Sequence, residues 1–194
     1  YYDYLLTNVD INQDIISLLI NGYITLNVQE LNEITGYSKE IIKEKINKYL
    51  PILKIISTDN SYTIYHESFR RFLLDKIKRA GSNIKILCYR KLADWMMTKK
   101  DIFETKMYNT YFQILYEAEK YSEIISKCNY EFVYESYLNG YYAQIDNVLE
   151  IISNSLKKVN VTPDKIIEYD LVKNMVCYSK DNIEFEYDSI CQYY

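Results

Sequence analysis

The sequence predicts a mainly α-helical protein: a winged helix, which is a helix-turn-helix with a small β-hairpin, followed by an irregular helical-repeat region of the α-solenoid, TPR-like kind. Only four glycines and two prolines interrupt the 194 residues, too few for a turn-rich sandwich or barrel. Apolar residues recur at helical spacing along most of the chain, and two β-rich runs follow Pro51. With 48% hydrophobic and 26% charged residues, we expect a folded, soluble chain without long disorder.

The chain opens with a predicted helix and a short β-prone run. The helix follows the N-cap candidates Asp10 and Asn12. It ends at Asn21 and Gly22, because glycine readily takes the left-handed conformation that closes a helix. Residues 23–26 (Tyr-Ile-Thr-Leu) are then β-prone and predict a short strand.

Two further helices, separated by a tight turn, predict a helix-turn-helix. Asn27 and Glu30 have the spacing of a capping box for a helix over 28–34, which Gly36 closes. Ser38 can cap the next helix. That third helix is expected to bury one apolar face, made of Ile41, Ile42, Ile46, Tyr49 and Leu50. A short turn between two such helices is a helix-turn-helix signal.

A β-hairpin is predicted directly after the third helix. Pro51 stops that helix, and β-rich runs occupy residues 52–57 and 62–66. Polar residues 58–61 (Thr-Asp-Asn-Ser) join them as a turn. The order helix, strand, helix, turn, helix, hairpin is that of a winged helix.

From residue 67 onward the sequence predicts helices and little else. Their spacing places them at 67–78, 84–97, 103–120, 121–128, 130–138, 140–157 and 163–178, with a break at Gly81 and Ser82. The helix over 84–97 is expected to bury Ile84, Leu87, Cys88, Leu92, Trp95 and Met96. Segments 120–125 and 140–145 share an aromatic residue, small or polar residues and an aliphatic, as TPR-like helices often do. We expect a winged-helix domain at 1–66, a linking helical pair at 67–99 and degenerate α-helical repeats at 100–194.

Composition and motifs argue against catalysis by this chain alone. No phosphate-binding loop or other catalytic motif is present, and the carboxylate pairs Glu30/Glu33 and Glu117/Glu119 have the spacing found on ordinary helices. The four cysteines lie far apart, which indicates buried thiols in a reducing, cytoplasmic setting and no zinc site. No apolar stretch is long enough to span a membrane. Because the chain lacks an initiator Met, we expect it to be a segment of a longer protein.

Charge is distributed unevenly along the chain. Residues 1–99 hold 14 Lys and Arg against 11 Asp and Glu, whereas residues 100–194 hold 9 against 16. A basic stretch between residues 70 and 91 supplies candidate phosphate or partner contacts at Arg70, Arg71, Lys76, Lys78 and Arg79. The alternative is a solvated helix face beside an acidic neighbour, and the overall charge of −4 makes nucleic acid the less favoured partner.

His66, the single histidine, stands between the hairpin and the next helix. One interpretation is a histidine packed at a strand–helix junction. The run 64–73 (Ile-Tyr-His-Glu-Ser-Phe-Arg-Arg-Phe-Leu), behind a winged helix, resembles the corresponding junction of STAND signal-transduction ATPases of the NACHT and NB-ARC type. In that family a hydrophobic–His–acidic motif ends the winged helix, and its histidine approaches the β-phosphate of bound ADP. His66 and Glu67 match the last two positions, and Tyr65 stands where plant members have Met.

The resemblance covers about residues 10–97 and implies a function. It implies a non-catalytic regulatory segment that binds no cofactor alone and contributes His66 to an ADP or ATP site completed by an upstream nucleotide-binding domain. The helical repeats would then contact a protein ligand or other protomers, in a bacterial setting during anti-phage defence. The alternative is a winged-helix transcription regulator with a helical effector or dimerisation domain.

Overall fold

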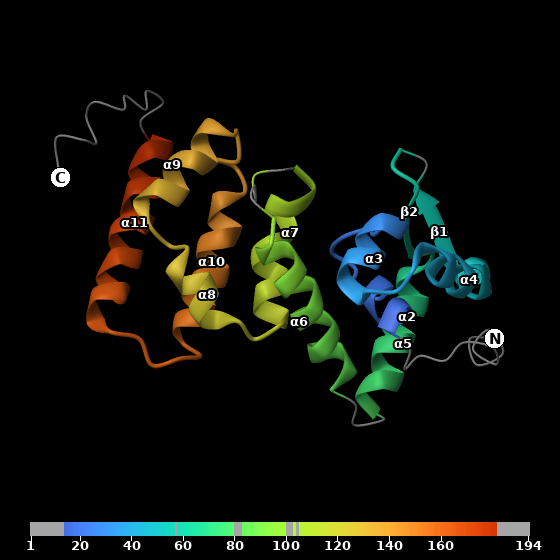
Figure 1. The fold of residues 1–194 in the computed structure, drawn as a ribbon. Coiled ribbons are helices and arrows are strands. Elements are labelled where there is room, and N and C mark those ends of the chain that lie inside the picture. Colours follow the sequence, from blue (N-terminus) through green and yellow to red (C-terminus); the bar gives the residue numbers. More distant parts are fainter. Residues whose placement is uncertain (1–13, 57, 80–82, 100–102, 104, 182–194) are drawn as a thin grey trace. The chain divides into compact units, whose positions relative to one another are not determined.

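The computed structural model describes residues 14–56, 58–79, 83–99, 103 and 105–181. Contacts divide the chain into two compact units, Tyr1–Lys120 and Tyr121–Tyr194. The described residues form ten α-helices, a short 3-10 helix and one two-stranded antiparallel sheet, which confirms the mainly helical fold (Figure 1). The predicted caps Asp10 and Asn12, the break at Gly81 and Ser82, and Cys191 lie outside the described residues.

Helix α2 (Asp14–Leu19) lies at the centre of the first unit, against α3 (Val28–Thr35), α4 (Lys39–Tyr49), α6 (Ile84–Met97) and β2 (Ser61–Ile64). Its apolar residues Ile15, Ile16, Leu18 and Leu19 are all at most 1% exposed. A helix that is apolar on every side is stable in water only when its neighbours cover it completely. Gly22 follows with φ 76°, the left-handed conformation that its position predicts.

The turn between α3 and α4 forms through the predicted local contacts. Asn27 Oδ1 accepts the Glu30 N–H at 2.9 Å, and Glu30 Oε2 accepts the Asn27 N–H at 2.8 Å, completing the capping box. Gly36 ends α3 with φ 73°, and Ser38 caps α4. Ile42 and Ile46 of α4 are buried as predicted, but Ile41 is 44% exposed. Ile41 lies to one side of the narrow stripe that faces the core, so the prediction that it is buried is wrong.

The hairpin pairs β1 (Leu53–Ile56) with β2, after a 3-10 helix, η1 (Leu50–Ile52). Leu50, predicted inward, is 42% exposed, because the chain leaves α4 at this point for η1. The β-prone run 23–26 contributes a single bridge instead of a full strand: Leu26 and Tyr62 exchange N–H···O bonds of 3.3 and 2.9 Å. β2 ends at Ile64, so His66 lies beyond the strand in which it was predicted.

Three helices complete the first unit. Helix α5 (Glu67–Arg79) buries Phe69, Leu73 and Ile77 and packs against β2 and α6, and α6 packs against α7 (Thr105–Glu117). The prediction that Leu87 faces inward is wrong, since it is 53% exposed. The buried face of α6 is centred on Cys88, Tyr89, Leu92, Ala93 and Met96, and Leu87 projects from the opposite side.

The second unit contains α8 (Tyr121–Ser126), α9 (Tyr130–Leu138), α10 (Ile145–Leu156) and α11 (Pro163–Asp181). Helix α10 packs against α8 and α11, and α9 also packs against α11. The two similar segments take different structures, because residues 121–125 lie in α8 whereas residues 140–144 form a turn before α10. None of the described helices is both long enough and apolar enough to cross a membrane.

Candidate functional site

His66 is exposed between β2 and the first residue of α5. Its carbonyl accepts the Arg70 N–H at 3.0 Å, which makes it the first acceptor of α5. Its ring meets the Tyr65 ring edge-on, with centroids 4.2 Å apart. Tyr65 is itself 60% exposed, and its N–H bonds to the Ile52 carbonyl at 2.9 Å. The backbone on both sides of the imidazole is therefore anchored while the ring faces solvent.

Glu67, the acidic residue of the motif, is bound by two arginines. Arg70 donates from Nε and Nη2 at 2.7 Å each, and Arg71 donates from Nε at 3.1 Å. These hydrogen bonds, first Arg70 and then Arg71, hold the pKa of Glu67 at about 2. Glu67 is consequently ionised at neutral pH, with its charge offset within its own helix. Its side chain is 53% exposed, so the pair adds little to stability.

Arg70 has a second role, facing the interior. Its side chain is 23% exposed, and Nη1 donates to the Ile20 carbonyl at 3.4 Å. The guanidinium also lies directly over Gly22, where an added Cβ would meet its atoms at 2.7–2.9 Å. Arg70 thus joins the start of α5 to the turn that follows α2.

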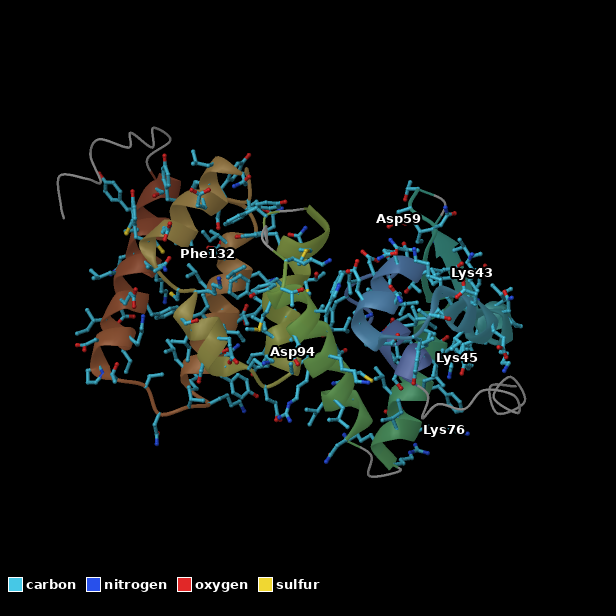
Figure 2. All side chains as sticks on the ribbon, in the orientation of Figure 1. Lys43, Lys45, Asp59, Lys76, Asp94 and Phe132 are labelled. Atoms are coloured by element: carbon cyan, nitrogen blue, oxygen red, sulfur yellow. The ribbon has the colours of Figure 1, made fainter. Side chains whose placement is uncertain are left out.

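The other candidate contacts do not form one basic face. Arg71 is 75% exposed and Lys78 and Arg79 are exposed, but Asp75 lies among them on the same side of α5. Lys76, labelled in Figure 2, points elsewhere and lies over the Phe72 ring at 5.1 Å. The predicted basic residues of α5 are therefore divided: Arg71, Lys78 and Arg79 share a face with Asp75, whereas Arg70 and Lys76 lie apart from that face.

Further along the basic stretch, the cations are paired with acids of the first unit. Lys85 Nζ lies 2.8 Å from Glu117 Oε2, and Arg90 Nη2 lies 3.5 Å from Glu119. The positive charge seen in the sequence is thus offset in part by the end of α7 and the residues after it.

All four residues of the two carboxylate pairs hold structural positions. Glu30 closes the capping box, and Glu33 accepts from Trp95 Nε1 and Lys99 Nζ at 2.8 Å each. The hydrogen bond from Lys99, followed by that from Trp95, lowers the pKa of Glu33 to about 2. This contact ties α3 to α6 and does not resemble a pair poised for acid–base work.

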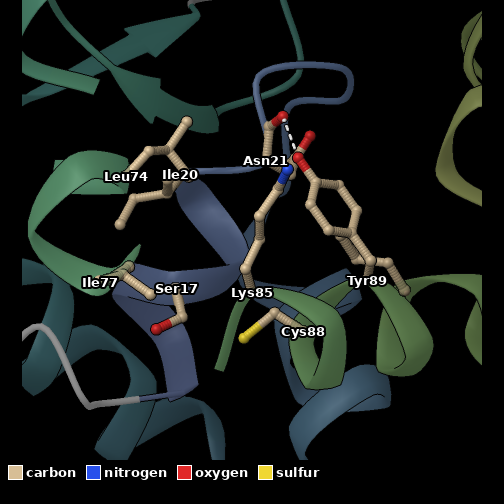
Figure 3. A pocket seen from close by; sticks show the side chains of 9 residues that line it. Ser17, Ile20, Asn21, Leu74, Ile77, Lys85, Cys88 and Tyr89 are labelled. Atoms are coloured by element: carbon tan, nitrogen blue, oxygen red, sulfur yellow. Dashed lines mark hydrogen bonds between the residues drawn. The ribbon is translucent and has the colours of Figure 1, made fainter. Parts of the chain in front are cut away.

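A polar cluster around the turn at residues 21–24, which we call the 21–24 turn, was not predicted from the sequence. Tyr89 of α6 donates its hydroxyl to the Asn21 carbonyl at 2.9 Å (Figure 3). Tyr23 donates its hydroxyl to Glu117 at 3.2 Å, and Lys85, bound to Glu117, lies 5.5 Å from the Tyr89 ring centroid. A small cavity with room for about one water molecule lies beside Tyr89 and is lined in part by Asn21 and Lys85. A tyrosine on the buried side of a helix needs a partner for its hydroxyl, which is the signal that could have found this cluster.

Burial shapes the ionisation of this cluster. It raises the pKa of Tyr23 to about 12, with Glu117 adding to the effect, and it raises the pKa of Tyr89 for the same primary reason. Both tyrosines therefore remain neutral hydrogen-bond donors throughout the physiological range.

Among the described residues, the cysteines and the metal-binding side chains form no cluster. Cys88 and Cys128 are buried as expected, and burial raises the pKa of Cys128 to about 12. Cys177 is exposed, so the prediction of a buried thiol is wrong there. Across the described residues, no three His, Cys, Asp or Glu side chains lie close enough to hold a metal ion.

Comparisons with protein-family models, with curated proteins and with solved structures found no match to this chain. The resemblance of residues 64–73 to STAND ATPases therefore remains a hypothesis. The observations that bear on it are the position of His66 and the order of the elements around it.

Proposed function

We propose that this chain is a non-catalytic regulatory segment of a STAND ATPase, which couples the bound nucleotide to ligand sensing and assembly. In this proposal residues 1–66 are the winged helix, 67–99 the linking pair and 100–194 degenerate repeats. The order α2, Leu26 bridge, α3, α4, β1, β2 supports the first of these assignments. The observation that carries the proposal is the exposed imidazole of His66 at the junction of hairpin and α5.

The surroundings of His66 suit an anion. A neutral imidazole donates one hydrogen bond to a phosphate oxygen, and its protonated form adds charge. The N-terminal end of α5, which begins at the next residue, carries partial positive charge. Glu67 would repel a phosphate, but Arg70 and Arg71 already offset its charge.

Retention of ADP by the assembled protein tests this proposal. With the nucleotide-binding domain present, His66→Ala should speed ADP release or raise basal signalling. Lys54→Ala, at an exposed position of the hairpin, is the control and should change neither. Unaltered ADP occupancy and basal activity in the His66 variant would rule out the phosphate contact.

The second unit supports the sensing and assembly part of the proposal. Its last described helix, α11, exposes Ile167, Leu171 and Tyr178, at 57%, 47% and 71%, along one side. Buried Val172 and Val176 lie on the other side. Exposed apolar side chains that line one side of a helix are typical of surfaces that bind a protein ligand or a neighbouring protomer.

DNA binding by a transcription regulator is the second candidate, favoured by exposed lysines on α4. Lys39 and Lys43 are exposed there, but Glu40 and Glu44 are exposed too, and Lys48 pairs with Glu44 at 3.1 Å. Such a mixed face gives a weak phosphate contact. A duplex gel-shift titration across salt concentrations separates the candidates, because tight binding with a steep salt dependence would favour the regulator.

A further inference from the structure

The 21–24 turn is held in one conformation by the side chain of Asn21. Asn21 is 3% exposed and makes four hydrogen bonds within the turn region. Nδ2 donates to the Leu18 and Ile24 carbonyls at 2.6 and 3.0 Å, and Oδ1 accepts the N–H groups of Tyr23 and Ile24 at 2.7 and 2.8 Å. With both ends of a buried amide satisfied, the turn moves as one rigid piece.

Helix α5 contacts this turn through Arg70. The guanidinium lies over Gly22 and reaches the Ile20 carbonyl, while the same group binds Glu67 in the first turn of α5. Glycine is required at position 22 because its φ is 76°, and a Cβ there would also push the Arg70 guanidinium aside. Any shift of the start of α5 therefore pulls directly on the turn.

Helices α6 and α7 contact the other side of the turn. Tyr89 reaches the Asn21 carbonyl from α6, and Tyr23 reaches Glu117, the last residue of α7. Lys85 binds the second carboxylate oxygen of Glu117. Glu117 is thus held by one residue of the turn and one residue of α6.

We infer that the 21–24 turn is a coupling hub, through which displacement of the first turn of α5 is transmitted to the C-terminal end of α7. The path runs from Glu67 and Arg70, through the turn, to Tyr23 and Glu117. Its two tertiary links, Arg70 to the Ile20 carbonyl and Tyr23 to Glu117, are polar contacts between segments far apart in sequence. The hydrogen bonds of Asn21 hold the turn between them. The inference goes beyond the proposed function and does not depend on a phosphate at His66, since it concerns contacts within the first unit only.

Hydrogen exchange on the 194-residue chain tests the hub, with Arg70→Gln compared with Arg71→Gln. Both arginines bind Glu67, but only Arg70 reaches the turn. The amides of residues 118, 119 and 120 are bonded to carbonyls of α7 and report on its end. We expect them to exchange roughly threefold or more faster in Arg70→Gln than in Arg71→Gln. Equal exchange in the two variants would overturn the inference.

A reciprocal pair of variants keeps the test decisive if Arg70→Gln fails to fold. Coupling between two sites acts equally in both directions. Glu117→Gln should therefore speed exchange of the Arg70 amide, which bonds to the His66 carbonyl, relative to Glu119→Gln. Glu119 is the matched control because it binds Arg90 and lies two residues from Glu117. Equal exchange at Arg70 in these variants would contradict the hub as well.

Discussion

Different kinds of contact stabilise the interiors of the two units of this chain. In the first, polar side chains join segments far apart in sequence, as in Tyr89 to Asn21, Trp95 to Glu33 and Tyr23 to Glu117. In the second, α10 buries a broad apolar face, and the buried hydroxyls of Ser136 and Ser155 donate back to carbonyls of their own helices. Directional contacts specify one arrangement, whereas apolar packing tolerates several side-chain shapes. We therefore expect the first unit to hold its helices in one defined arrangement. We expect the second unit to provide a surface for partners.

The largest loss of stability should come from a large-to-small substitution in the apolar core of the second unit. Ile152 of α10 is 0% exposed, so Ile152→Ala should lower the free energy of unfolding by about 2–5 kcal/mol. Ile152→Leu keeps the volume and should cost less than about 1.5 kcal/mol. Urea unfolding followed by circular dichroism measures both, and a Leu variant as damaging as the Ala variant would refute tolerant packing in this unit.

A smaller effect, without any loss of volume, is expected in the first unit. Tyr89→Phe removes only the hydroxyl and leaves the buried Asn21 carbonyl without that donor, which should cost about 1–2 kcal/mol. Tyr65→Phe is the control, since Tyr65 is 60% exposed and should change stability by less than about 0.5 kcal/mol. If the two Phe variants unfold at the same urea concentration, Tyr89 does not hold the 21–24 turn as described.

The smallest effect concerns Glu33 and depends on pH. The pKa of Glu33 is about 2 in the folded chain against an ordinary value of 4.5, so its contribution is complete above the ordinary value and lost as pH falls toward 2. Partial exposure screens the contact, so Glu33→Gln should cost under about 1 kcal/mol at neutral pH. The gap between the two proteins should shrink as the pH is lowered through this window. A gap that stays constant would mean that the charge of Glu33 is irrelevant to folding.

Local features of the fold could be predicted from the sequence. The Asn27–Glu30 capping box, the cap at Ser38 and the left-handed Gly22 and Gly36 each depend on residues a few positions apart. The extent of the strands was less predictable, because β2 ends where the chain turns into α5 at His66. Residues close together in sequence decide these features, so the order of residue types alone is enough to predict most of them.

The tertiary contacts could not be predicted in the same way. Arg70 was predicted as a phosphate or partner contact, and its position over Gly22 depends on how α5 meets the end of α2. Leu87 fits an apolar helical pattern, but the neighbours of α6 cover Tyr89 and Ala93 instead. Periodicity shows which residues share a face, and only the packing of distant segments decides which face is buried.

The proposal that His66 senses a nucleotide has one direct measurement. His66 is the single histidine of the sequence, so its imidazole signals in a ¹H–¹⁵N NMR spectrum need no assignment within this chain. With only this chain isotopically labelled and joined to its nucleotide-binding domain, addition of ADP should shift both ring nitrogens and slow exchange of the donating N–H. Ring signals that stay unchanged on saturation with ADP would contradict the proposal.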